Sequence, residues 1–523
     1  MNLLKDPWIP VRTDGGTGTF RLLTYQQLLC ETGNWQVSLS RDDMELACVQ
    51  LLVCMTQVMF LPEDNRALRT RIASALSVAD FSAGVNPCQA WFDLDHPTQP
   101  FMQSRGVKAE KVTPIQKILV GLPEGNNHAF FNEVGEVKKL SGSLTAIALF
   151  NQASNANSMG GGFKGNLRGG SNPYLTPVNI LVNGSDLREL VWRNVLTLPR
   201  IQKLLPGWQL DWKRDQPTWV KPIQANETIK WNDIGLVRGL FWQPTRLELI
   251  QEPLITSCDV LEGAPTQVYS GFLKEKFKFA VDGLWPHPHG ARTAILVDGG
   301  LKWKFSAFRA TSPAWTQLSE FVVPRGINDP NAREGSEPSG PVAQADELGE
   351  GRLHLWVGGY CAKQGSIVGR RHDMLSLAKG WRDDKERLPK LIAIGMRARD
   401  SLLDAIFQVA FGKGKLKGIG LVHKKKGRRI IRNRKDATGF HDISEKLFYA
   451  RTESLIHETF SNEPAPMEWA ATRSAYAQQI ASHCRAIFEE LTDPYAMKPE
   501  LIPVIAWARR SLNNDLTKLM EEA

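Results

Sequence analysis

The sequence predicts an α+β protein in which a large, irregular mixed α/β N-terminal domain is followed by a C-terminal four-helix bundle. A chain of 523 residues is too long for one ordinary core, so more than one domain is expected. Up to about residue 320, helical patterns alternate with short strand-like runs, whereas long amphipathic patterns dominate after about residue 373. The predicted domains are therefore residues 1–375 and 376–523.

Composition favours a folded chain with an anionic partner. Hydrophobic residues make up 42% and charged residues 23%, and the net charge of +9 favours nucleic acid. Seven scattered cysteines include no Cys-x-x-Cys pair, so neither a zinc ribbon nor a disulfide framework is predicted. Polar residues interrupt the longest apolar stretch, Leu46–Leu61, and the first ten residues lack the apolar run of a signal peptide. A cytoplasmic protein without membrane contact is expected.

Three local patterns organise the N-terminal domain. Ser40 is the expected N-cap of the first long helix, with Asp43 three residues later. The runs Lys276–Val281 and Thr293–Val297 predict short strands. Pro324–Arg352 is rich in Gly, Pro, Asn, Asp and Glu, which predicts a long surface loop or linker.

The C-terminal domain is predicted from helical periodicity. Four amphipathic patterns of this kind suit a helical bundle. They lie at Ile392–Phe411, Ser444–Phe460, Glu468–Leu491 and Leu501–Met520.

A glycine-rich stretch, Asn157–Gly170, is the first candidate binding element. Its six glycines leave backbone N–H groups open to close approach, and Lys164 and Arg168 suggest that the approaching molecule is anionic. The spacing matches neither a Walker loop nor a dinucleotide fingerprint. The alternatives are a surface that packs against a nucleic-acid groove or phosphates, and a tight turn.

A dense basic stretch is the second candidate. One alternative is a solvated loop; the favoured one is an arm that contacts phosphates, because like charges repel unless a polyanion neutralises them. Its members, with no acidic residue among them, are Lys413, Lys415, Lys417, Lys424, Lys425, Lys426, Arg428, Arg429, Arg432, Arg434 and Lys435.

The segment Lys274–Phe279 alternates lysine with Glu or Phe. As a strand it would place Lys274, Lys276 and Lys278 on one face. The alternatives are an edge strand with lysines turned to solvent, and a lysine that enters a nucleic-acid groove.

Two histidine motifs are candidates for a catalytic site. His287 and His289 would need a third metal ligand that the sequence does not supply nearby, so a rigid loop is favoured. Arg370–Asp373 contains a His–Asp pair but no nucleophile motif, which favours a salt-bridge cluster at a helix start.

Lys363, Gln364 and Gly365 form a short polar turn, expected between a glycine pair and a helix. Taken alone, the turn predicts only a surface feature.

Taken together, the sequence resembles the CasA-type large subunit of Cascade, the type I-E CRISPR surveillance complex. The resemblance runs nearly end to end. The stretches that carry it include Trp8-Ile-Pro-Val-Arg12, Arg41-Asp-Asp-Met-Glu-Leu46, Pro100-Phe-Met-Gln103, Leu144-Thr-Ala-Ile-Ala-Leu-Phe-Asn-Gln152, Met159-Gly-Gly-Gly-Phe-Lys164, Val237-Arg-Gly-Leu-Phe-Trp-Gln-Pro244, Gly271-Phe-Leu-Lys-Glu-Lys-Phe277, Gly283-Leu-Trp-Pro-His-Pro-His289 and Arg370-Arg-His-Asp373.

The resemblance implies a protein that is not an enzyme and needs no cofactor. Members of this family recognise the protospacer-adjacent motif in double-stranded DNA, promote duplex opening, hold the displaced strand and help recruit a helicase–nuclease for antiviral defence. The implied partners are target DNA, the guide RNA and the other Cascade subunits, including the small-subunit dimer and the subunit at the 5′ end of the guide. The same two-part architecture is implied.

The resemblance also assigns residues. The glycine loop that faces the motif matches Gly160, Gly161 and Gly162, the minor-groove lysine matches Lys276, and the wedge glutamine matches Gln364, flanked by Lys363 and Gly365. A loop at about residues 131–143 is implied to contact DNA and the guide. Its expected contacts are Phe130, Asn132, Lys138 and Lys139. The dense charge of the basic stretch, rather than the resemblance, predicts displaced-strand or phosphate contacts, with contact to the small subunits as the alternative. The residues concerned are Lys424, Lys425, Lys426, Arg428, Arg429, Arg432 and Arg434.

The chain departs from the family in two places. Ser141 and Leu144 stand where some relatives carry the first cysteine pair of an apparent zinc site, and only Cys258 remains near the second, so no zinc is predicted. The basic stretch from about His423 to His441 resembles an insertion. Two other functions stay open: a metal-dependent nuclease that uses the two histidines, and a pure RNA and protein scaffold.

Overall fold

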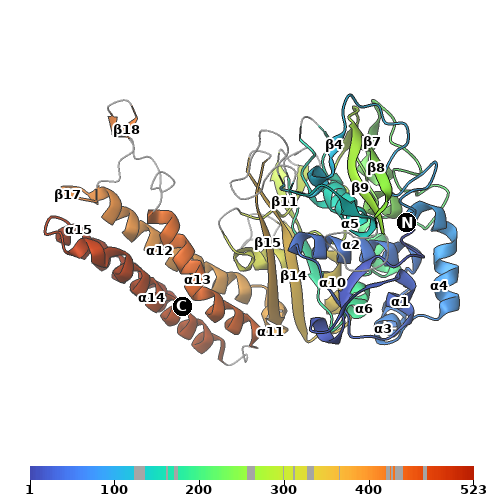
Figure 1. Cartoon of the computed structure of the whole chain (residues 1–523). Helices are drawn as coiled ribbons and strands as arrows, with labels where there is room; N and C mark the ends of the chain where they lie inside the picture. The colour runs from blue at the N-terminus through green and yellow to red at the C-terminus, as the bar shows by residue number, and fades with distance from the viewer. Residues whose placement is uncertain are drawn as a thin grey trace. The chain divides into compact units, whose positions relative to one another are not determined.

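The computed structural model of this 523-residue chain describes every residue except 123–135, 161–162, 170–174, 256–265, 298–299, 310–311, 327–334, 364–365, 420–423, 426–427, 430–439 and 463–467 (Figure 1). The backbone contacts divide it into two compact units. The N-terminal unit comprises Met1–Thr311 and Glu320–Met374, and the C-terminal unit comprises Ser312–Ser319 and Leu375–Ala523.

The strands of the N-terminal unit form several small sheets, most of them antiparallel. This arrangement agrees with the predicted irregular α+β class. In the order of paired neighbours, the first sheet contains β2 (Phe20–Leu23), β1 (Ile9–Arg12) and β3 (Gln36–Val37), and the second contains the parallel pair β10 (Ala280–Asp282) and β7 (Thr228–Lys230). Two further sheets contain β12 (Gly300–Phe305), β11 (Arg292–Val297) and β13 (Gly335–Glu337), and β15 (Ser366–Ala378), β14 (Arg352–Lys363) and β6 (Asn179–Val182). In the last sheet, β9 (Thr266–Glu275) pairs with β4 (Thr113–Pro114), β5 (Leu140–Ser141) and β8 (Arg246–Ile255).

Helices surround these sheets and fill the centre of the unit. They are α1 (Tyr25–Cys30), α2 (Asp42–Met59), α3 (Asn65–Ala73), α4 (Val78–Val85), α5 (Gly142–Asn155), α6 (Leu187–Arg193), α7 (Leu198–Leu204), α8 (Leu236–Leu240) and α10 (Gly340–Glu347); α9 (Leu318–Val322) lies at the junction of the two units in the chain.

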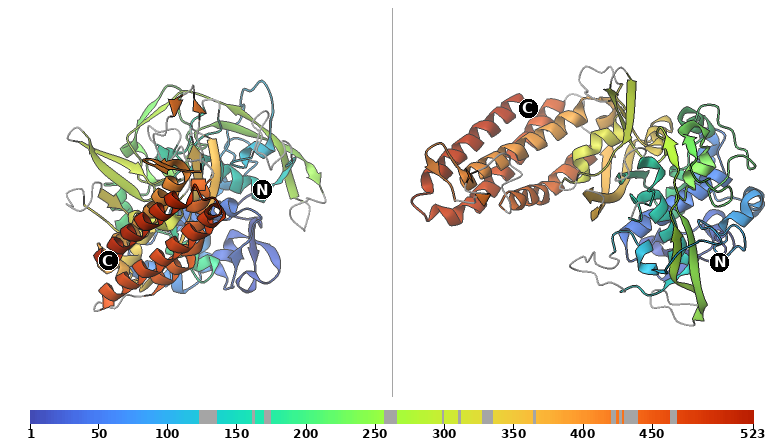
Figure 2. Two further views of the ribbon diagram at one scale, coloured as in Figure 1. Left: turned by 90° about the vertical axis from the view of Figure 1, so that its left-hand side faces the viewer. Right: turned by 90° about the horizontal axis from the view of Figure 1, so that it is seen from above.

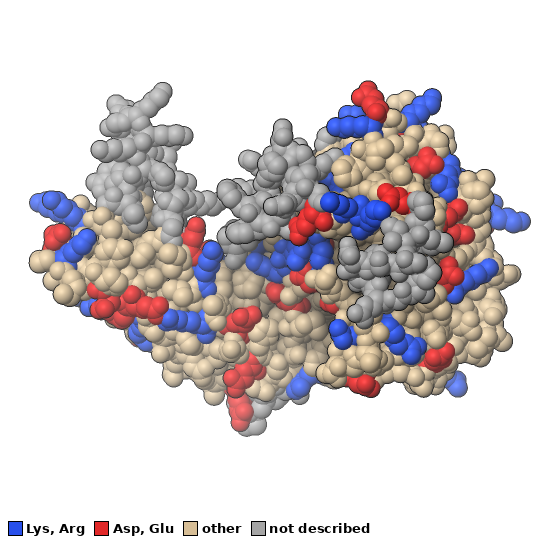
Figure 3. All heavy atoms as spheres, in the orientation of Figure 1, with Lys and Arg blue, Asp and Glu red and all other residues tan. Residues whose placement is uncertain are grey.

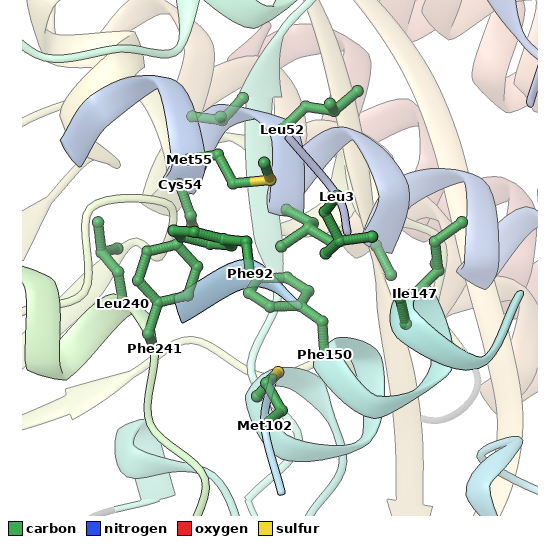
Figure 4. Close-up of a cluster of buried hydrophobic side chains, with 14 of the residues drawn as sticks. Leu3, Leu52, Cys54, Met55, Phe92, Met102, Ile147, Phe150, Leu240 and Phe241 are labelled. Carbon is green, nitrogen blue, oxygen red and sulfur yellow. The ribbon is translucent and has the colours of Figure 1, made fainter. Parts of the chain in front are cut away.

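Helix α2 forms the centre of the hydrophobic core. Nearly every one of its residues is buried, and it packs against α5 and α6. A helix that is buried on nearly all sides must lie inside a protein, and the polar side chains that α2 carries there, such as Asp43 and Gln50, are hydrogen-bonded. Figure 4 shows Met55 of α2 in the same apolar cluster as Phe92, Phe241 and Phe150, the last from α5. The core thereby fixes the ends of α2 and α5, which carry the polar residues described below.

The predicted cap of α2 is wrong in detail. The helix begins at Asp42 and its N-cap is Arg41, without a capping bond from a side chain. Asp43 does not complete a capping box but is buried and bound by the Arg41 guanidinium. The acidic first turn still stabilises the helix, because carboxylates offset the positive end of its dipole.

The predicted linker Pro324–Arg352 is also wrong. It contains β13 and α10, and Ser339 and Gln344 within it are fully buried. Ser339 Oγ donates to the Ile180 carbonyl at 3.1 Å, and Gln344 Oε1 accepts from Thr197 N at 2.9 Å. Distant backbone groups thus satisfy polar residues that a compositional rule assigns to solvent.

The C-terminal unit contains four long helices, α12 (Arg387–Phe411), α13 (Phe440–Ser461), α14 (Trp469–Ala496) and α15 (Ile502–Glu522), preceded by the short α11 (Gly380–Asp383). Each lies where helical periodicity predicts it. The four run alongside one another in Figure 1 and in both views of Figure 2, and α12 packs against the other three. Two short hairpins follow α12: β16 (Gly412–Lys413) with β17 (Leu416–Lys417), and β18 (Lys424–Lys425) with β19 (Arg428–Arg429). Within the described residues of either unit, no helix has the length and apolar character needed to cross a membrane.

Candidate nucleic-acid interface

The glycine loop is closed at its base by backbone contacts. A Cβ at Gly165 would lie 1.4 Å from the Asn157 carbonyl oxygen, so only glycine fits there. Asn166 Nδ2 donates to the Ala156 carbonyl at 2.7 Å and holds the two ends of the loop together. Between these ends, Gly160 is exposed, has a φ of +79° and leaves open space around a Cβ. Gly161 and Gly162 lie outside the described residues.

Arg168 does not contribute a surface charge to this loop. It is 1% exposed, and its guanidinium donates to Asn179 Oδ1 at 2.5 Å and to Asn155 Oδ1 at 2.7 Å. Burial lowers the pKa of Arg168 to about 9, because desolvation disfavours the charged guanidinium. Of the two cations in the glycine stretch, only Lys164 is exposed to a ligand.

The predicted strand through Lys274–Phe279 is wrong, although Lys276 and Lys278 are exposed as that prediction requires. Strand β9 ends at Glu275. Beyond it, Lys276 and Lys278 are exposed while Phe279 is buried. Lys274 lies in the strand and is half-buried. The structure therefore presents Lys276 and Lys278 on a segment that leaves the sheet.

The glycine loop and this lysine segment lie against each other. Lys274 Nζ lies 5.2 Å from the ring centre of Phe163, and Lys164 Nζ lies 5.6 Å from that of Phe279. Each contact pairs a cation from one segment with an aromatic ring from the other, at distances where cation–π attraction is effective. Two candidate elements that are more than 100 residues apart in sequence thus form one surface.

The segment before β4 adds lysines that sequence analysis missed. Strand β4 pairs with β9 through Thr113 and Phe272, which brings the preceding residues beside the end of β9. There, Lys108 N donates to the Glu275 carboxylate at 3.1 Å. Lys108 and Lys111 are exposed. No local motif marks them, because only the strand pairing places them next to Lys276.

The turn Lys363–Gly365 connects two paired strands rather than a strand and a helix. β14 ends at Lys363 and β15 begins at Ser366. Gln364 and Gly365 lie outside the described residues, as does the Lys363 side chain. The predicted helix start at Arg370–Asp373 is likewise wrong, since these residues belong to β15. The predicted ion pairing is present, because Arg370 Nε lies 2.9 Å from Asp42 Oδ1.

The loop assigned to about residues 131–143 is described only in its last part. Phe130 and Asn132 lie outside the described residues. Lys138 is exposed, and Lys139 forms an ion pair of 2.5 Å with Glu252 of β8. Ser141 caps α5 by accepting a bond from Leu144 N at 3.3 Å. Cys258 is also outside the described residues.

Among the lysines and arginines of the insertion, only the backbones of Lys424, Lys425, Arg428 and Arg429 are described. The backbones of Lys424 and Lys425 pair with those of Arg429 and Arg428, respectively. The side chains of these four residues, together with Lys426, Arg432 and Arg434, lie outside the described residues. On the face shown in Figure 3, the described Lys and Arg side chains are interspersed with Asp and Glu. Net charge alone therefore does not locate the interface on this face.

The two histidines considered for metal binding are buried. His287 Nδ1 accepts a bond from His289 N at 3.1 Å, and the two rings are 5.1 Å apart. Burial, together with the nearby Arg168 charge, lowers the pKa of His289 to about 3 and that of His287 well below its usual value. Within the part of the chain that the structure describes, no three His, Cys, Asp or Glu residues gather to hold a metal ion.

Comparisons with known proteins identify relatives over the whole chain. A profile of the family described as "CRISPR-associated protein Cse1" matches residues 2–487. Cse1 from Thermobifida fusca superposes with a TM-score of 0.72 at 15% identity, covering 100% of this chain and 98% of that one. CasA from Thermus thermophilus gives 0.69 at 16% identity, with 99% of each chain covered. A chain of a structure titled "CRISPR RNA-guided surveillance complex" gives 0.64 at 14% identity, covering 98% of this chain and 99% of that one. At these identities the structural likeness establishes the shared fold.

Proposed function

Because the chain belongs to the CRISPR-associated Cse1 family, we propose that it is the non-catalytic large subunit of a type I-E surveillance complex and recognises the protospacer-adjacent motif from the minor groove. The observation that carries this proposal is the contact between the glycine loop and the lysine segment. Through Phe163–Lys274 and Lys164–Phe279, it places Gly160 and Lys276 on adjoining segments. The family assigns these two elements to the same motif.

Minor-groove chemistry fits these residues. A·T and T·A pairs both present N3 and O2 acceptors there, so a reader of this groove tolerates several motifs. The Lys276 ammonium is a donor for such acceptors. A glycine backbone without Cβ atoms can approach base edges closely and discriminates by fit. Gly161 and Gly162 take part in this contact.

Duplex opening follows motif binding in this proposal. Gln364, flanked by Lys363 and Gly365, enters the duplex below the motif, which costs a few kcal/mol of unstacking. Because exchange of a DNA duplex for a guide–target hybrid is nearly balanced in free energy, motif contacts can decide whether opening proceeds. The displaced strand is then held by the basic insertion, and a helicase–nuclease is recruited.

The remaining lysines are proposed to increase affinity for DNA rather than to recognise its sequence. Lys108, Lys111 and Lys278 are exposed around the same end of β9 and are proposed to contact phosphates. Phosphate contacts orient a protein on the duplex without carrying sequence information. Lys138 is proposed to contribute in the same way, near the guide end.

The test is duplex binding by a guide-loaded complex assembled with and without this chain, at physiological salt. Targets identical except for the adjacent motif are compared. The proposal requires that the chain make binding depend on the motif. Equal affinities with and without the chain would mean that it acts only as a scaffold. Lys276→Ala is expected to lower the ratio of affinities for the two targets. Lys213→Ala, an exposed lysine outside these segments, is the matched control.

A second variant separates the two kinds of lysine. The double variant Lys108→Ala, Lys111→Ala is expected to weaken binding of both targets equally. The slope of log K against log salt should become shallower by about 0.9 per lost phosphate contact. A change in motif preference would instead show that these lysines take part in recognising the motif bases.

The geometry does not favour a metal-dependent nuclease. His287 and His289 are 6% and 2% exposed, so a substrate phosphate cannot reach them without unfolding the loop.

A further inference from the structure

A network of buried polar side chains lies behind the candidate interface. Most polar groups in a core are hydrogen-bonded, and a connected network restrains the segments that contribute to it. Its members are the buried residues Asp43, Gln50, Asn151, Asn155, Arg168, Asn179 and Tyr360, together with the half-buried Arg41.

Asp43, at the start of α2, is the centre of one half. Arg41 donates to both of its carboxylate oxygens at 2.9 and 2.7 Å, and the Tyr360 hydroxyl donates at 2.6 Å. Asn151 Nδ2 lies 2.7 Å from the Tyr360 hydroxyl oxygen and 3.3 Å from Asp43 Oδ2. Burial opposes the charged carboxylate, but the bonds from Arg41 and Tyr360 outweigh it and hold the pKa of Asp43 below its usual value.

Asn155, at the end of α5, is the centre of the other half. Its Nδ2 donates to Asn151 Oδ1 at 3.0 Å and to Gln50 Oε1 at 2.8 Å. Its Oδ1 accepts from Arg168 at 2.7 Å and from Asn179 at 3.0 Å. Side-chain hydrogen bonds therefore run without a break from Arg168 to Asp43.

The network ends on the segments that carry the proposed DNA contacts. Arg168 belongs to the glycine stretch. Tyr360 and Arg370 lie on β14 and β15, and Arg370 pairs with Asp42 beside Asp43. Arg41 also donates to the Val120 carbonyl at 2.8 Å, shortly before residues 123–135.

A small apolar cluster joins the same segments independently. Val120, Ala156 and Tyr360 are buried together, with Ile367 of β15 packed against them. Ala156 follows α5 and opens the glycine stretch, where its carbonyl accepts from Asn166. Polar and apolar contacts thus tie one end of the glycine stretch to both strands of the hairpin.

We propose that this network holds the base of the glycine loop and strands β14 and β15 as one rigid unit, so that motif contact at the loop is passed to these strands and supports duplex opening. Asn151 and Tyr360 are then positioning residues that touch no DNA. The inference rests on the proposed function and deepens it, because it assigns the coupling between motif binding and opening to named buried groups.

The test uses the complete guide-loaded complex with Tyr360→Phe, which removes one hydroxyl and keeps the apolar contact with Val120. Two targets with the correct motif are compared: a closed duplex carrying a fluorescent base beside the motif, and a duplex opened beforehand by mismatches. We expect opening of the closed duplex to slow roughly tenfold, the effect of one lost hydrogen bond to a charged group. Binding of the pre-opened target should stay within about twofold of wild type.

Tyr25→Phe is the matched control, since Tyr25 is buried in the same unit and its hydroxyl lies 2.9 Å from Thr56 Oγ1, outside the network. It should open duplexes at the wild-type rate. Wild-type opening by Tyr360→Phe, or equal slowing by both variants, would overturn the inference. So would equal losses on closed and pre-opened targets, because these indicate a purely structural role. If the wild-type complex itself opens duplexes without regard to motif, the proposed function fails first.

Arg168→Lys examines the other end of the network and replaces Tyr360→Phe if that variant does not fold. It keeps the charge but loses the forked bonds to Asn155 and Asn179. Combined with Tyr360→Phe, it should slow opening by less than the product of the two single effects, because both variants interrupt one network. Multiplicative effects would show that the two ends act separately and would overturn the proposal.

Discussion

Individual glycines of the glycine loop are required for different physical reasons. Gly165 is enclosed by the Asn157 carbonyl, whereas Gly160 is open to solvent but has a positive φ. The first glycine is therefore required by packing and the second by backbone conformation. The sequence shows six equivalent glycines, and the closed base that separates their roles appears only in three dimensions.

Gly165→Ala is expected to destabilise the N-terminal unit by at least about 2 kcal/mol, because its Cβ would displace a backbone carbonyl. Gly160→Ala should cost only about 1 kcal/mol, the strain of a left-handed alanine. Free energies of unfolding from urea titrations of both variants test this. A larger loss for Gly160→Ala would contradict the closed-base geometry.

The buried histidines predict sensitivity to acid. Burial depresses the folded-state pKa of His287 and His289 below the unfolded value of about 6.5. Their contribution to stability is thus present above pH 6.5 and is lost as the pH falls toward the folded-state value, about 3 for His289. Between pH 6.5 and 5, each histidine should account for a loss of about 2 kcal/mol.

His289→Asn should accordingly lose about 2 kcal/mol less stability than wild type over this range, whatever its stability at pH 7. Urea titrations at the two pH values measure the difference, and His354→Asn, at an exposed position, is the control. Equal losses in wild type and His289→Asn would show that other groups determine the acid sensitivity.

Among the secondary-structure elements, the long helices follow from local sequence, whereas the short strands do so only in part. The predicted strand Thr293–Val297 is present as β11 (Arg292–Val297). All four long C-terminal helices lie where their apolar periodicity predicts them, because i, i+3 and i+4 positions share one face whatever the partner. The supposed strand through Lys276 instead leaves the sheet after Glu275. The pairing of β9 with β4, β5 and β8 decides where it ends, and these partners are distant in sequence.

Close packing within the bundle gives a prediction at this scale. A Cβ at Gly395 of α12 would lie 2.8 Å from the Tyr476 hydroxyl oxygen and 3.3 Å from the Trp315 ring. Gly395→Val should destabilise the bundle by about 2 kcal/mol through overpacking. Ala393→Val, on the exposed face of the same helix, should cost less than about 1 kcal/mol. Loss of helical circular dichroism in urea measures both, and equal effects would contradict close packing at Gly395.

At the scale of the whole molecule, the net charge of +9 is distributed unevenly along the chain. Much of the excess positive charge lies in the basic insertion, which is a different segment from the lysines around the end of β9. Replacing residues 423–435 by a Gly/Ser segment of equal length should flatten the salt dependence of displaced-strand binding by about 0.7 per lost contact. An unchanged slope together with weaker binding of the small subunits would assign the insertion to protein contacts instead.

The family, the α+β class, the four C-terminal helices and Lys276 as a candidate DNA contact could all be predicted from the sequence. These depend on motif order and on local periodicity. Three features required the three-dimensional structure: Lys108 and Lys111 lie near the end of β9, Arg168 is buried, and part of 324–352 belongs to the core. The physical reason is that burial and charge pairing depend on segments brought together by strand pairing and core packing. No pattern within a short stretch of sequence encodes those neighbours.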